Sequence, residues 1–86
     1  MPSKPLFLTA HARLRMHDRK IRREWVERTI RAPDWTAPGP RNPTVERRFR
    51  AIGEFSGRIL RVVCVETIST IRVISVMFDR DARRRT

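Results

Sequence analysis

The chain has 86 residues, enough for one domain and too few for two separate hydrophobic cores. Its 20 Lys and Arg against 9 Asp and Glu give a formal net charge of +11, and all but two of these cations are Arg. Such a charge exceeds what solubility needs and indicates a polyanionic or acidic partner. Nucleic acid is the partner we expect, because Arg forms forked hydrogen bonds with phosphates and stacks on bases.

Several classes of protein are excluded by what the chain lacks. No apolar run approaches the roughly 18 residues of a membrane span, and the first residues carry no secretory signal, so we expect a cytoplasmic protein without a membrane partner. Cys64 is the single cysteine and cannot form an intramolecular disulfide or a zinc site alone. Without a phosphate-binding loop or a metal-ligand cluster, we expect no cofactor and no metal. Residues 1–86 are predicted to form one domain with an ordered core at about 7–78.

The N-terminal third predicts two helices. Residues 1–5 are expected to be disordered, and Leu6-Phe7-Leu8 to form at most a short edge strand. Thr9 is a typical N-cap for a helix over Ala10 to Asp18. One face of this helix is predicted to point into the core. Its residues, spaced i, i+4, i+7 and i+11, are Ala10, Leu14, His17 and Ile21.

A second helix is predicted from Arg22 to Arg31, ending before Pro33. Its apolar stripe consists of Trp25, Val26, Thr29 and Ile30, and its exposed i, i+4 pairs are Glu24–Arg28 and Glu27–Arg31. Four prolines and Gly39 between residues 33 and 43 predict an irregular, exposed connection. Trp35 on this connection is expected either to stack on a base or partner, or to anchor the loop.

Beyond the loop the apolar period changes to two. Strands are predicted at Val45 to Ile52, Arg58 to Glu66 and Thr70 to Phe78, with a turn at 53–57 and a basic tail at about 80–86. The middle strand is apolar on both faces, which predicts a central strand covered on both sides. Cys64 within it is expected to be a buried, inert thiol.

Two basic groups could bind an anion. His11, Arg15 and Arg19 are spaced i, i+4, i+8, which places them within about 80° of arc on the first helix. Arg48 and Arg50 share one face of the first long strand with Glu46. If the two groups are adjacent they form a phosphate-binding trough; otherwise the helix stripe is an ordinary solvated face.

Few residues could transfer protons. Histidine ordinarily titrates near neutral pH, and of the two histidines His17 is expected in the core while His11 leads the basic stripe. Glu46 and Glu66 rank second as bases, because neighbouring Arg residues should lower the pKa of a carboxyl group.

The stretch Thr9-Ala10-His11-Ala12 with Arg15-Met16, Arg19 and Ile21 resembles the H-A-x-x-R-M-x-x-R-x-I opening of a small bacterial domain family of unassigned function. That family groups with the BrnT and RelE/ParE toxins. The resemblance extends over about residues 7 to 78, through Val26 to Asp34, Arg48-Phe49-Arg50 and the segments Leu60 to Val65 and Ile71 to Ser75.

The resemblance implies an α+β fold with two N-terminal helices packed on an antiparallel sheet of three to four strands. It also implies a toxin–antitoxin component that binds RNA and acts as a metal-independent endoribonuclease of the mRNA interferase type, silenced by an acidic or DNA-binding antitoxin. The corresponding catalytic positions are His11, Arg15 and Arg19, and the phosphate-binding positions are Arg48, Arg50 and Arg61. A non-catalytic module that binds nucleic acid or protein through the same face, and a gyrase-directed toxin, remain alternatives.

Overall fold

The structure is a computed structural model that describes residues 4–82. It contains two α-helices and five strands. In chain order the elements are β1 (Leu6–Leu8), α1 (Ala10–Arg19), α2 (Arg23–Arg31), β2 (Trp35–Pro38), β3 (Glu46–Ile52), the 3-10 turn η1 (Gly53–Phe55), β4 (Arg58–Glu66) and β5 (Ile71–Phe78). The expectations for residues 1–3, and for residues 83–86 of the basic tail, lie outside the described residues.

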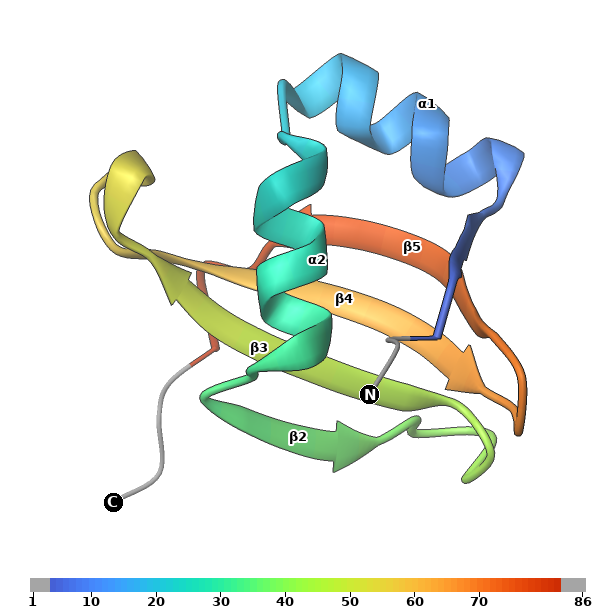
Figure 1. Ribbon diagram of the computed structural model, residues 1–86. Coiled ribbons are helices and arrows are strands. Elements are labelled where there is room, and N and C mark those ends of the chain that lie inside the picture. Colours follow the sequence, from blue (N-terminus) through green and yellow to red (C-terminus); the bar gives the residue numbers. More distant parts are fainter. Residues whose placement is uncertain (1–3, 83–86) are drawn as a thin grey trace.

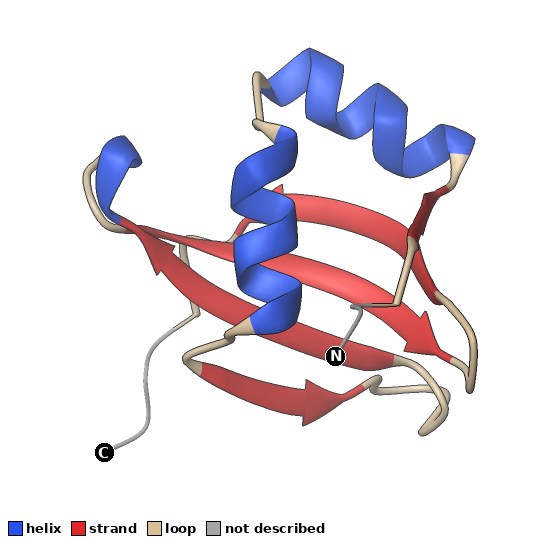
Figure 2. Ribbon diagram, in the orientation of Figure 1, coloured by secondary structure: helices blue, strands red, loops and turns tan. Residues whose placement is uncertain are grey.

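The strands form one sheet in the order β1-β5-β4-β3-β2, and both helices pack on the same face of it (Figures 1 and 2). β2 to β5 are antiparallel to their neighbours, whereas β1 runs parallel to β5. The α+β class with two N-terminal helices is therefore confirmed. The sheet differs from the expected three or four antiparallel strands because both edges carry an additional short strand.

The core lies between the helices and the sheet. Its fully buried members come from Ala12 of α1, from α2 and from the helix-facing positions of β3, β4 and β5. The largest side chains among them are Ile52, Leu60, Val26, Val62, Val73 and Val76. Cys64 is also completely buried here, as expected, and burial raises the pKa of its thiol.

Capping at both ends defines α1. The Thr9 hydroxyl oxygen accepts a hydrogen bond from the Ala12 N–H at 3.2 Å and donates to the Ile74 carbonyl at 3.1 Å, so the cap also ties the helix to β5. At the other end Lys20 adopts a left-handed conformation with φ of 55°, and its N–H donates to the carbonyl of His17. The predicted N-cap and helix are confirmed.

The predicted buried face of α1 was wrong. Ala10 and His17 are exposed, Leu14 is 58% exposed, and of the four predicted core residues only Ile21 is buried. Ala12 and Met16 face the core instead. The small Ala12 side chain, which is completely buried, sits where α1 lies directly against the sheet, so close packing determines the face rather than the longest apolar period.

The second helix has the predicted buried stripe of Trp25, Val26, Thr29 and Ile30. Its expected exposed pairs do not form: Glu27 accepts from Arg23 at 3.2 Å, and Arg28 forms two hydrogen bonds of 2.8 Å with Glu54 on η1. The Glu54 contact spans the helix and the sheet, so Arg28 fastens α2 to the β3–β4 turn.

The proline-rich connection contains a strand, contrary to expectation. Trp35–Pro38 pairs with β3 as an edge strand, where the missing N–H of Pro38 is tolerated at the last position. The Trp35 ring stacks on Phe49 with centroids 4.9 Å apart. Trp35 thus anchors this segment to the sheet, in agreement with one of its two expected roles.

The helices cover only one face of β4. Leu60, Val62 and Cys64 point toward the helices and are buried, whereas Ile59, Val63 and Val65 on the opposite side are only half-buried. The prediction of a strand covered on both sides is therefore wrong for the part of the chain that the structure describes. We call the side of the sheet away from the helices the open face.

Candidate nucleic-acid interface

The stripe of His11, Arg15 and Arg19 is exposed along its whole length. Arg15 and Arg19 line a cleft, whereas His11 lies outside its lining. The three residues thus keep the exposed face that the sequence predicts, but only the two arginines belong to the cleft.

This cleft, which we call the arginine cleft, has a volume of about 840 Å³. It lies between the end of α1, the turn before β4 and the segment after β5. Arg15 and Arg19 are joined in its lining by Arg58 and Arg80, two residues that sequence reasoning did not single out. None of the four forms an ion pair within residues 4–82.

An aromatic group forms one wall of the arginine cleft. Phe55 packs on Phe78 and Trp25 with ring centroids 4.7 Å and 5.9 Å away, and it remains 37% exposed. The Arg58 guanidinium carbon lies 5.0 Å from the centroid of the Phe55 ring. This cation–π contact places the planar guanidinium beside the aromatic group. Ser56 and Gly57, both at positive φ, form the turn between Phe55 and Arg58.

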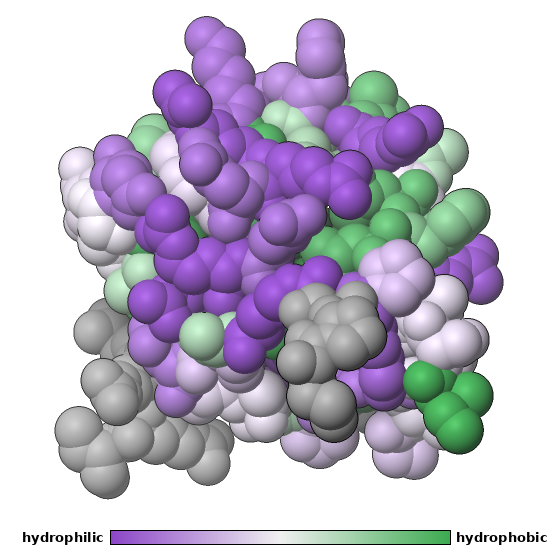
Figure 3. All heavy atoms as spheres, in the orientation of Figure 1, coloured by the Kyte–Doolittle hydropathy of each residue, from purple (hydrophilic) through white to green (hydrophobic). Residues whose placement is uncertain are grey.

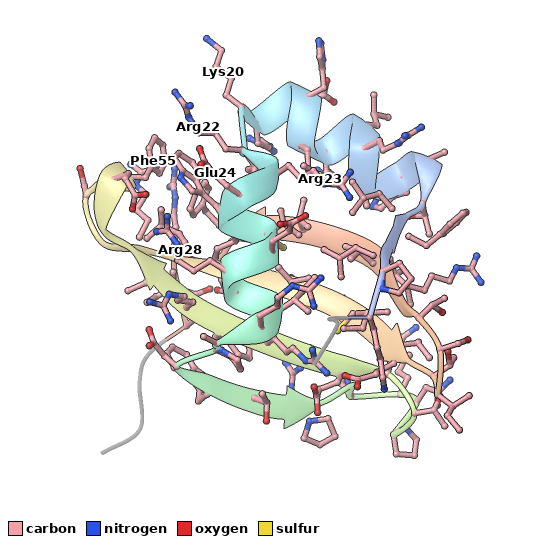
Figure 4. All side chains as sticks on the ribbon, viewed as in Figure 1. Lys20, Arg22, Arg23, Glu24, Arg28 and Phe55 are labelled. Atoms are coloured by element: carbon pink, nitrogen blue, oxygen red, sulfur yellow. The ribbon has the colours of Figure 1, made fainter. Side chains whose placement is uncertain are left out.

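More cations surround the junction of the two helices. Figure 4 shows Lys20 and Arg22 pointing outward there, on the same side of the molecule as Phe55. In the same view the surface over α2 and this junction is almost continuously hydrophilic (Figure 3). Glu24 lies 3.6 Å from Arg22, so part of this charge is compensated. The lining of the arginine cleft also includes Asp79, which bonds to Arg61, and Asp81, so four arginines face two carboxylates there.

Arg48 and Arg50 have structural contacts instead. Arg48 is 11% exposed; it bonds to Glu46 and Glu66 and donates to the Ile30 carbonyl at 3.0 Å. Arg50 donates to the Ala32 carbonyl. Both cations therefore cap the C-terminal end of α2, where a positive charge is favourable. The predicted trough does not form from these arginines and the stripe on α1.

Glu66, which bonds to Arg48, has the predicted direction of pKa shift. Hydrogen bonds from Arg48 and Lys4 lower the pKa of Glu66 to about 2. The pKa of Arg48 is raised, because its bonds to Glu66 and Glu46 outweigh the opposing effect of burial. Glu66 is thus held as a carboxylate and is a poor base near neutral pH.

Arg61 lies on the open face. It donates to Asp79 at 3.1 Å and contacts the Met77 sulfur, and its buried Nε has no hydrogen-bond partner within residues 4–82. The six predicted site residues therefore occupy three separate places: the α1 stripe, the end of α2 and the open face. Only Arg15 and Arg19 share a cleft.

The remaining chemistry is limited. His17 is exposed, with its Nδ1 3.7 Å from Asp18, so its predicted core position was wrong. Residues 4–82 hold no cluster of three metal-ligating side chains. Among the same residues no helix is long and apolar enough to cross a membrane.

Comparison with known proteins identifies the family. The pattern of a family described as "Domain of unknown function (DUF4258)" matches residues 8–78, and the chain belongs to that family. No curated protein and no solved structure matches the chain. The match begins at Leu8, the last residue of β1, and ends with β5, so it covers both helices and strands β2 to β5.

Proposed function

We propose that this domain binds single-stranded RNA in the arginine cleft. The observation that carries the proposal is the convergence of Arg15, Arg19, Arg58 and Arg80 on one hollow without an ion-pair partner among the described residues. Phosphates would pair with the arginines, and a base would stack on the Arg58 guanidinium above Phe55. The net charge of +11 would add long-range attraction for the strand.

Fluorescence anisotropy with a labelled single-stranded RNA tests this proposal. The double variant Arg15→Gln/Arg19→Gln should weaken binding about 10- to 100-fold, since each lost charged contact contributes on the order of 1 kcal/mol. The matched control is Arg13→Gln/Arg41→Gln, which removes the same charge at exposed positions outside the cleft. Equal losses in both variants would show that net charge alone binds the RNA and would contradict the cleft.

RNA cleavage is the second candidate function, favoured by the position of His11 one turn from Arg15 on the same exposed stripe. A strand running from the cleft along α1 would pass the imidazole. His11 would accept the proton of a ribose 2′-OH while the 2′-oxygen attacks the adjacent phosphorus. The bond from phosphorus to the 5′-oxygen breaks, the 5′-oxygen takes a proton from water, and a 2′,3′-cyclic phosphate forms. The arginines would stabilise the phosphorane charge.

Gel analysis of end-labelled RNA separates cleavage from binding. His11→Ala should lower a cleavage rate by about 10²–10⁴-fold while leaving the RNA affinity within about twofold. His17→Ala is the control, because His17 is an exposed histidine on the same helix. Wild-type protein that binds RNA without cutting it would leave a binding module as the function.

The biological role that we propose is the toxin component of a toxin–antitoxin pair, related to the BrnT and RelE/ParE groups. Support comes from the helix motif at residues 9–21 and from the basic cleft. Induced expression of the wild-type chain should stop growth and reduce amino-acid incorporation, and Arg15→Gln/Arg19→Gln should relieve both effects. Growth arrest that persists in the cleft variant would assign the toxicity to another surface, such as one directed at gyrase.

A further inference from the structure

The open face carries an apolar surface of its own. Cross-strand register places two rows of side chains on it, Trp35–Phe49–Arg61–Met77 and Ala37–Arg47–Val63–Ser75. Phe7, opposite Arg72 at the β1 edge, is 60% exposed, and Met77 is 38% exposed. The solvent-facing side of a sheet normally carries polar residues. On β4, however, Ile59, Val63 and Val65 make this side largely apolar.

The charges on the open face are mostly positive. The arginines on it are Arg47, Arg61 and Arg72, and Arg61 bonds to the carboxylate of Asp79 just after β5. Arg72 is exposed and forms no ion pair within residues 4–82. The surface thus combines an apolar centre with uncompensated positive charge, which is a typical composition of a docking site for an acidic, amphipathic partner.

Two other occupants fit less well. A second copy would bring these arginines and two net charges of +11 together, which is unfavourable. An RNA strand would place phosphates over Val63 and Val65, which offer no hydrogen bonds. An amphipathic helix satisfies both features, because its apolar stripe can cover β4 while flanking carboxylates reach the arginines.

We propose that the open face binds an acidic amphipathic helix of a partner protein. β4 extends over nine residues, or roughly 30 Å, which matches a helix of about 18 residues. Such a helix would lie on the opposite side of the sheet from α2. It would cover the second face of β4, which is apolar like the face that packs on the helices. Ile59 and Met77 line both the open face and the arginine cleft. Val63, Val65 and Arg72, however, lie outside the cleft, so substitutions at these three positions test the docking site separately from RNA binding.

A displayed library of 18-residue helical peptides with randomised surfaces, panned against the full chain, tests the proposal. The enriched peptides are expected to combine one apolar stripe with flanking Asp and Glu. Titration should then show at least tenfold weaker binding to Arg72→Glu and to Val63→Ser. Arg13→Glu on α1 is the matched control for charge reversal and should change binding less than twofold. Circular dichroism verifies that each variant is folded.

Three results would overturn the proposal. Failure to enrich any peptide, or enrichment of peptides without carboxylates, would remove the acidic helix as the occupant. Peptide binding that survives both Arg72→Glu and Val63→Ser would place the site elsewhere. Sedimentation of the wild-type chain as a dimer that Val63→Ser dissociates would make a second copy the occupant. Because Arg72 is exposed, its variant should fold even if Val63→Ser does not.

Discussion

Arginine side chains in this molecule divide by environment into structural and free cations. Arg48 contacts two carboxylates and a helix carbonyl, and Arg28 joins α2 to η1, whereas Arg15 and Arg19 have no ion-pair partner among residues 4–82. The amino-acid sequence alone does not distinguish these environments. The distinction determines which substitutions should change stability and which should change binding.

Replacement of Arg48 should therefore act on stability. Arg48→Ala removes the bonds to Glu46 and Glu66 and leaves the Ile30 carbonyl without its donor, so we expect a loss of about 1–3 kcal/mol in the free energy of unfolding. Arg15→Ala, at an exposed position, should change it by less than about 0.5 kcal/mol. Urea denaturation measures both. Equal stability of the two variants would mean that Arg48 has no capping role.

Glu66 predicts a pH dependence. Its pKa is about 2 in the folded protein and 4.5 ordinarily, so the unfolded chain binds a proton first as the pH falls. The stabilisation by Glu66 is therefore complete above about pH 4.5 and is lost between pH 4.5 and 2. Thermal unfolding of Glu66→Gln should show a shallower decline in that interval than wild type. A decline of Glu66→Gln as steep as that of wild type would contradict the role of this carboxylate.

Among the elements, α1 shows best what the sequence could and could not predict. Its N-cap and length depend on local hydrogen bonds, which Thr9 and the spacing of residues express directly. Its buried face depends on how closely the helix approaches β5, which no local pattern records. The residues that face the core, Ala12, Met16 and Ile21, are the apolar members of the helix motif at residues 11–21.

A pair of substitutions on α1 tests this orientation. Leu14→Gln should change the free energy of unfolding by less than about 0.5 kcal/mol, because Leu14 is largely exposed. Met16→Gln places an amide against the core and should cost about 1–3 kcal/mol. If denaturation showed Leu14→Gln to be the more destabilising variant, Leu14 would face the core, as the apolar spacing predicts.

The strands were predicted best where the alternation of apolar and polar residues extends over the most residues. β4 was predicted with its observed bounds, and β3 and β5 to within a residue, because side-chain alternation and burial agree there. β2 was missed because its prolines obscured an edge strand whose pairing depends on Phe49 beneath Trp35. The arginine cleft was half predicted: Arg15 and Arg19 share a helix face, but Arg58 and Arg80 join them only through the tertiary fold.

At the scale of the whole molecule, the helix layer and the sheet layer present different surfaces. The arginine cleft lies at one end of the sheet beside α1, and the open face extends across the opposite side from the helices. The two sites that we propose, one for RNA and one for an acidic helix, would therefore use largely different residues, with Ile59 and Met77 at the border between them.

The central claim is that phosphates bind in the arginine cleft, and the salt dependence of RNA affinity tests it most directly. For a single strand the slope of log K against log salt changes by about 0.7 for each phosphate contact. Arg15→Gln/Arg19→Gln should therefore flatten the slope by about 1.4 relative to wild type, while Arg13→Gln/Arg41→Gln leaves it nearly unchanged. A slope that is the same in the cleft variant and in wild type would contradict the account.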